Sequence, residues 1–299
     1  MRRKVVKHGS NTLTVSLPSK WAKLQGIKSG DEIDIHEQEN SLIVNSTETT
    51  AKSKKIEIEI ATADQFRKRL ILKPYLCGYD EIKITYQEKG VIDKIYSSLP
   101  MVTLGSEIIE QGKNYCVIKN VSEVSTEEIE QMMNRLMLFV IDVFNDLIES
   151  IRKNDFETIN NLSSMWMMVY KLSFFCIRNI NKKKYIKKDN LSYYPTIIML
   201  FEGIGDTLRQ ICFFITEQKP KLSEETIKIM NDILLNLRDH YKLFHKYDQA
   251  KLIQTEKKRK LLEKSCMDKQ LKSQPKEAVV ISYLYGVLLS IKNISLWVN

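Results

Sequence analysis

Three kinds of hydrophobic pattern follow one another along the chain. In residues 5–48, apolar and polar side chains alternate in short runs, as in half-buried β-strands, and turn-forming residues separate the runs. Residues 54–122 combine such alternation with two helical stretches. From Ser125 onward, apolar residues recur every three or four positions over long segments, which is typical of amphipathic helices. The pattern predicts an α+β N-terminal part followed by an all-α bundle.

The first module, residues 1–50, contains only short elements. Leu13 and Val15 belong to an alternating strand, and one short helix is expected between an N-cap at Ser19 and a stop at Gly26. Such elements cannot bury a core large enough for independent stability. We therefore expect the module to complete its core by pairing with a second copy, as a homodimer or a higher homo-oligomer.

Residues 54–122 predict a small α/β domain that follows a polar linker at residues 46–55. Strand, helix, strand, helix and hairpin patterns succeed one another here. The segment has no glycine-rich phosphate-binding loop. Its expected role is therefore spacing or dimerisation.

Residues 125–299 predict six helices in two three-helix repeats. The sequence STEE, which begins at Ser125, is close to a capping box. The third and sixth helices, Phe201 to Thr216 and Leu284 to Asn299, match each other. Helix breaks are expected near Asn154, at residues 181–190, at residues 217–223, around Tyr247 and at residues 273–277.

One bundle segment, Ala278 to Val298, is long and apolar enough to cross a membrane. Neighbouring segments are nearly as apolar yet carry charges, so we interpret it as a bundle helix and expect no membrane insertion. The five cysteines lie far apart, and the N-terminus has no apolar signal-peptide core. A cytoplasmic protein with free thiols is expected.

The charge distribution singles out the first module. The formal net charge of +9 indicates an anionic partner, such as nucleic acid or an acidic protein surface. Residues 1–30 contain seven Lys and Arg residues and no acid, whereas residues 31–48 contain six acids and neither Lys nor Arg. A single short module is thus divided into a basic and an acidic section.

The stretch RRKVVKHGSNTLTVSLPSKWAKLQGIKSGDEIDIHEQENSLIV, residues 2–44, resembles the AbrB/SpoVT (MazE-like) swapped-hairpin DNA-binding domain, particularly its archaeal version. The resemblance implies that two chains interleave their hairpins into one β-barrel-like dimer, which binds double-stranded DNA. Candidate phosphate contacts are Arg2, Arg3, Lys4 and Lys7, candidate contacts to phosphates or base edges are His8, Ser10, Asn11 and Thr12, and Lys20 and Lys23 flank them. The alternative is an ordinary solvated basic strand.

The duplicated three-helix pattern, with FEGIGD at residues 201–206, resembles the PhoU family of phosphate-uptake regulators. Archaeal chains that resemble this one join an AbrB-like domain to a PhoU-like domain. In the PhoU family, such carboxylate pairs collect divalent or iron-type metal ions, and Glu202 and Asp206 match one pair. The second repeat has Tyr285 and Leu289 in the corresponding positions, so the alternative is a pair of acids that are solvated or bound to Arg178 or Arg209.

Together the two resemblances predict a DNA-binding transcription regulator of phosphate uptake. The alternative is an adaptor that restrains the ATPase subunit of a phosphate ABC transporter, with the first domain used only for dimerisation. His240 and His245 are five residues apart and so predict no metal pair, and the basic runs at residues 181–189 and 257–260 are interpreted as solvated. The sequence assembles no nucleophile, base and orienting acid, so we expect no enzyme.

Overall fold

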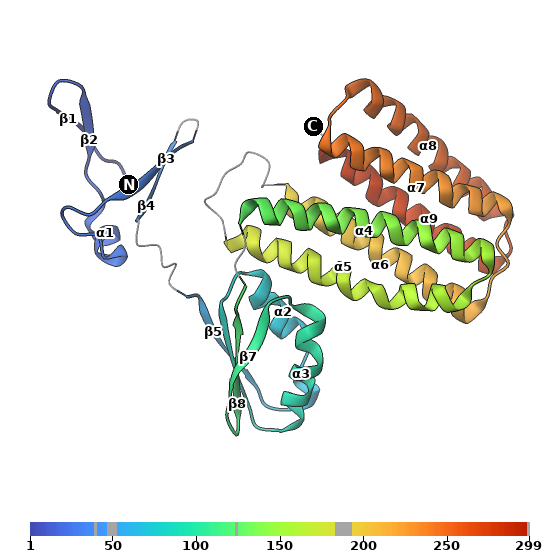
Figure 1. Ribbon diagram of the computed structural model, residues 1–299, viewed down its shortest axis with the longest axis horizontal. Helices are drawn as coiled ribbons and strands as arrows, with labels where there is room; N and C mark the ends of the chain where they lie inside the picture. The colour runs from blue at the N-terminus through green and yellow to red at the C-terminus, as the bar shows by residue number, and fades with distance from the viewer. Residues whose placement is uncertain (39–40, 47–52, 123–124, 183–192, 298–299) are drawn as a thin grey trace. The chain divides into compact units, whose positions relative to one another are not determined.

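The computed structural model describes residues 1–38, 41–46, 53–122, 125–182 and 193–297. The chain divides into two compact units, Met1–Ser53 and Lys54–Asn299 (Figure 1). The predicted fold class is confirmed, because a strand-rich α+β part precedes a helical bundle.

Unit 1 contains two separate hairpins in its described residues. Strand β1 (Val5–His8) pairs with β2 (Thr12–Val15), helix α1 (Ser19–Gln25) follows, and β3 (Ile33–Gln38) pairs with β4 (Ser41–Ser46). Gly26 ends α1 in the left-handed conformation, with φ of 73°, as its sequence position predicts. The predicted N-cap is wrong, because Ser19 is the first helical residue and Pro18 precedes it without a side-chain capping bond.

Unit 1 has no buried side chain among those whose exposure is described. Trp21 and Ile27 are only half-buried, whereas Val5, Leu13 and Val15 are each more than half exposed. A single copy therefore leaves in water the apolar surface that a folded core would cover.

The first part of unit 2 is a four-stranded sheet with helices on one face (Figure 1). Its described elements are β5 (Lys55–Ile60), η1 (Ala63–Gln65), α2 (Arg69–Leu76), β6 (Glu81–Tyr86), α3 (Gly90–Val102), β7 (Ser106–Gln111) and β8 (Tyr115–Asn120). The strand order is β5-β6-β8-β7, with β5 parallel to β6 and the other neighbours antiparallel. Ile82, Ile84 and Tyr86 alternate into the core, while Lys83 and Thr85 between them face away from it.

The second part of unit 2 is the bundle. Six α-helices occur in its described residues: α4 (Thr126–Lys153), α5 (Phe156–Lys182), α6 (Tyr194–Gln218), α7 (Glu224–His245), α8 (Gln249–Lys272) and α9 (Pro275–Ile294), which continues into η2 (Ser295–Trp297). The capping box is confirmed, because the Ser125 side chain accepts from the Glu128 backbone and the Glu128 side chain binds back to Ser125. Helices α4 to α6 pack together, as do α7 to α9, and the two groups meet through α4 with α7 and α6 with α9.

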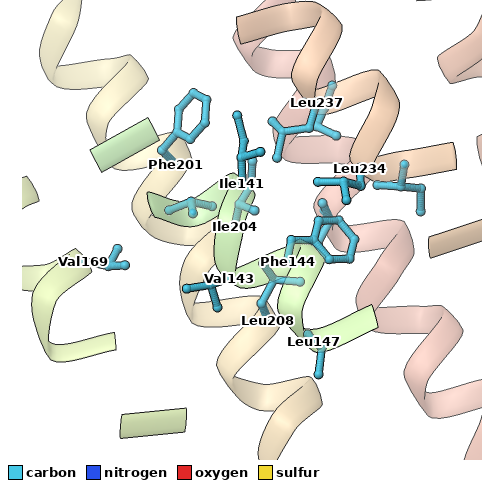
Figure 2. Packing of buried hydrophobic residues seen from close by; sticks show 14 of the residues in the cluster. Ile141, Val143, Phe144, Leu147, Val169, Phe201, Ile204, Leu208, Leu234 and Leu237 are labelled. Carbon is cyan, nitrogen blue, oxygen red and sulfur yellow. The ribbon is translucent and has the colours of Figure 1, made fainter. Parts of the chain in front are cut away.

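Figure 2 shows the core where these groups meet. Phe144 of α4 lies near Leu208 of α6 and Leu234 of α7, and all three are at most 2% exposed. Complete burial of a side chain such as Phe144 contributes about 2 kcal/mol to folding. The two groups of helices share one core, since α4, α6, α7 and α9 all contribute to the same cluster of buried hydrophobic residues.

Helix α9 is the segment of membrane-spanning length. Among the described residues, Pro275–Trp297 alone has the length and composition to cross a bilayer. In this fold it packs against α6, α7 and α8, and Leu284, Val287 and Ile291 are fully buried. These contacts agree with the interpretation of α9 as a bundle helix.

Candidate nucleic-acid interface

The β1–β2 hairpin contains five of the predicted DNA-contact residues, which lie in or next to its turn: Lys7, His8, Ser10, Asn11 and Thr12. Lys7 lies opposite Leu13 and His8 lies opposite Thr12, so residues 9–11 close the hairpin. Gly9 has φ of 71°, in the left-handed region that glycine adopts without steric cost. The turn thereby holds Ser10 and Asn11 at the exposed tip, where their side chains are accessible to a ligand.

The hairpin separates the predicted residues onto two faces. Side chains that lie directly opposite each other share a face, so Lys7 and Leu13 lie with the pair Val5 and Val15. His8 and Thr12 lie on the other face, because successive side chains in a strand alternate. Lys7 and His8 are both predicted to contact DNA. The register shows that their side chains point to opposite sides of the hairpin.

The basic residues of unit 1 are exposed. Arg2, Arg3 and Lys4 precede β1, while Lys20 and Lys23 are three residues apart on α1 and therefore lie on one side of that helix. Within the described part of the chain, no ion pair involves any of these five side chains or Lys7. Their charges are thus available to an external anion such as a phosphate backbone.

The predicted metal residues, Glu202 and Asp206, lie one turn apart on α6. Asp206 Oδ1 accepts from the Tyr170 hydroxyl at 2.6 Å and from Arg209 Nη2 at 2.7 Å. Burial, together with the nearby Asp206 carboxylate, raises the pKa of Glu202 to about 7. Asp206 pairs with Arg209, as the alternative interpretation expects, whereas buried Arg178 binds Asp80 elsewhere.

No group of three or more potential metal ligands occurs among the described residues. Asp206 Oδ1 already accepts three hydrogen bonds, one from Tyr170 and two from Arg209, so a cation there would have to displace or share these donors. A metal ion at Glu202 and Asp206 stays a prediction. Metal analysis of the purified protein beside Asp206→Ala tests it.

A buried polar network in the second repeat was not foreseen. His240 is fully buried, with Nε2 3.3 Å from Glu256 Oε1 and Nδ1 2.9 Å from the Asn236 carbonyl oxygen. Burial would raise the pKa of Glu256, but hydrogen bonds from His240 and Arg259 hold it at about 2. The solvated interpretation of the 257–260 run is wrong for Arg259, which is 2% exposed and also binds Glu263.

His245 and Lys182, which belongs to the other basic run, have partners outside the His240 network. His245 Nε2 lies 3.1 Å from Asn134 Oδ1, away from the His240 network, as their spacing predicts. Of the basic run at residues 181–189, residues 183–189 lie outside the described ranges. Lys182 forms a 2.6 Å ion pair with Asp80, which assigns it a contact within the fold.

Comparison with known families supports the interpretation of unit 1. Residues 6–55 match the sequence model of the family described as "Antidote-toxin recognition MazE, bacterial antitoxin". The match covers nearly all of the predicted swapped-hairpin module and about a sixth of the chain. No curated protein matches the chain.

Proposed function

We propose that the protein is a non-catalytic, homodimeric transcription regulator that binds double-stranded DNA through unit 1. The observation that carries this proposal is the exposed, acid-free basic section at residues 1–30, which overlaps a segment similar to the MazE antitoxin family. The family similarity supports this use, since members of such swapped-hairpin families bind DNA as dimers.

Support for the dimer comes from the exposed apolar side chains on one face of the β1–β2 hairpin. Val5, Leu13 and Val15 are 62%, 71% and 54% exposed, and they share one face. Covering apolar surface contributes roughly 25 cal/mol per Å². A second copy that covers this face, which also carries Lys7, leaves His8 and Thr12, on the opposite face, available to the duplex.

DNA binding can be tested by fluorescence anisotropy of the full chain with random-sequence duplex DNA at several salt concentrations. We expect log K to fall linearly with log salt. Arg3→Ala/Lys4→Ala, which changes predicted contacts that precede β1, should weaken binding and reduce the slope by about 0.9 for each phosphate that is no longer neutralised. Lys28→Ala/Lys54→Ala is the matched control, because it removes the same charge outside the predicted contact set. Salt-independent binding, or equal weakening in both double variants, would contradict the proposal.

The bundle supplies the finer part of the proposal, which is that it senses or relays phosphate status. Support comes from the PhoU-like sequence resemblance and from the packing of α4 to α6 and α7 to α9 as two similar groups. A genome-wide DNA-binding profile under phosphate limitation tests this part. Occupancy that does not change with phosphate supply would count against it while leaving DNA binding intact.

The adaptor alternative is favoured by one surface of α8. Ile253, Leu261, Met267 and Leu271 are all more than half exposed on this helix, and protein partners commonly cover such surfaces. An adaptor should co-purify with the ATPase subunit of a phosphate transporter after deletion of residues 1–50. Failure to capture that subunit with either form would remove the alternative.

A further inference from the structure

A pocket opens at one end of the first three-helix group. It lies between the turn that joins α4 to α5 and the turn that joins α6 to α7, and its volume is about 620 Å³. Polar atoms make up the larger part of the surface that the pocket exposes, and six apolar residues form the remaining apolar wall: Ile151, Phe156, Ile159, Ile215, Leu222 and Ile227. Pockets for small organic ligands typically measure about 300–1,000 Å³, and the volume of this pocket falls in that range.

Three cations surround this apolar wall. Arg152 and Lys221 line the pocket, and Lys219 Nζ lies 5.5 Å from the centre of the Phe156 ring. In the described residues, none of the three side chains forms an ion pair. Glu224 is the one acid in the lining, so the two lining cations outnumber it two to one, and Lys219 adds a third positive charge beside Phe156.

The backbone at the rim of the pocket is also unusual. Among the described residues, the two non-glycine residues with positive φ are Asn154, at 54°, and Lys219, at 44°. They end α4 and α6, the helices whose last turns border the pocket. Asn is common at such a helix end, but a lysine in this conformation costs about 1 kcal/mol or more relative to glycine. The lysine at position 219 thus places a cation beside Phe156 at an energetic cost.

We propose that this pocket binds a small organic anion with an apolar body, such as an aryl or alkyl carboxylate or sulfonate. The anionic head lies between Arg152 and Lys221, and the body lies against the partly exposed side chains of Phe156 and Leu222. Orthophosphate alone would leave the apolar wall exposed to water, so an amphiphilic anion fits better. This inference goes beyond the proposed DNA binding and does not depend on it.

The probe for the test is 8-anilinonaphthalene-1-sulfonate, whose fluorescence rises in an apolar site, titrated into the full chain. We expect Arg152→Ala/Lys221→Ala to weaken its binding roughly tenfold or more, because the sulfonate head then has neither cation beside it. The matched control is Lys153→Ala/Lys228→Ala, which removes two nearby lysines that are absent from the lining. This control should change the affinity less than about twofold, since those charges are exposed and solvated.

An uncharged relative, N-phenyl-1-naphthylamine, separates the head from the body. It should bind with the same affinity to the wild type and to Arg152→Ala/Lys221→Ala. The proposal is overturned if the sulfonate binds both proteins equally or if the control variant weakens binding as much. Displacement of the sulfonate by millimolar orthophosphate, seen only with the wild-type cations present, would overturn the requirement for an apolar body.

Discussion

Arg178 on α5 lies 3.1 Å from Asp80, which directly precedes β6, and this ion pair joins the bundle to the sheet part of unit 2. Arg178 is fully buried and also donates to the carbonyl oxygens of Tyr75 and Tyr79. Asp80 in turn accepts from Lys182 and from the backbone of Lys54, the first residue of unit 2. One carboxylate therefore holds both the last turn of α5 and the start of β5.

Removing one partner of this pair should destabilise unit 2. Arg178→Ala leaves the Asp80 carboxylate with one cation fewer and also uncovers buried carbonyl groups, so we expect unfolding to become easier by about 3–5 kcal/mol. Urea unfolding monitored by circular dichroism measures it. Lys153→Ala serves as the control, because its 3.7 Å pair with Glu149 is exposed and contributes less than about 1 kcal/mol. Equal destabilisation in the two variants would show that Arg178 has no special structural role.

Glu277 should make the bundle sensitive to acid. Its carboxylate accepts from the Ser223 backbone, the Ser223 hydroxyl and the Thr226 hydroxyl, at 2.8, 2.7 and 2.6 Å. Burial opposes ionisation, but these hydrogen bonds hold the pKa of Glu277 at about 2. Because the pKa is lower in the folded state, this stabilisation is present above about pH 4.5 and is lost as the pH falls toward 2.

The matched variant for this prediction is Glu277→Gln, which cannot titrate. Its stability should be lower than that of the wild type at neutral pH, and the difference should shrink between about pH 4.5 and 2. Denaturant unfolding at a series of pH values measures the difference. If the difference in stability between the wild type and Glu277→Gln stayed constant with pH, the charge of the Glu277 carboxylate would not contribute to the stability of the bundle.

Two glycines of α6 offer an internally controlled test of helix packing. A Cβ at Gly205 would lie 2.5 Å from the Trp166 ring, whereas a Cβ at Gly203 would meet nothing within 4 Å. We expect Gly205→Ala to destabilise the bundle by roughly 1–3 kcal/mol through overpacking. Gly203→Ala should instead stabilise it by up to about 1 kcal/mol, because alanine is the better helix former. Thermal unfolding of the two variants distinguishes them, and the reverse order would refute the close approach of α5 and α6.

The two faces of the β1–β2 hairpin should separate dimerisation from DNA binding. Leu13→Asp puts a charge on the apolar face and should give a monomer that no longer binds DNA. Thr12→Asp, on the opposite face, should remain a dimer but bind DNA more weakly, because its charge repels phosphate. Light scattering coupled to size-exclusion chromatography, with anisotropy on the same samples, gives both quantities. A dimeric Leu13→Asp variant would remove this assignment of the faces.

The sequence by itself determined the order and type of the elements. Alternation around Leu13, the capping box at Ser125, the stop at Gly26 and the helix break at Asn154 are all local signals, and each is found in the structure. Local signals suffice here because capping and periodicity involve residues within one or two turns of each other. The same reasoning located the basic hairpin, since its charges are close together in the chain.

Only the tertiary structure decided which distant groups meet. Asp80 and Arg178 are 98 residues apart, Ser223 and Glu277 are 54 apart, and Tyr170 reaches Asp206 across a helix interface. The same holds for Arg259, which resembles its exposed lysine neighbours in sequence but is buried on the inner face of α8. Periodicity indicates that a helix has a buried face, but the packing of other helices against that face determines which polar side chains find partners there.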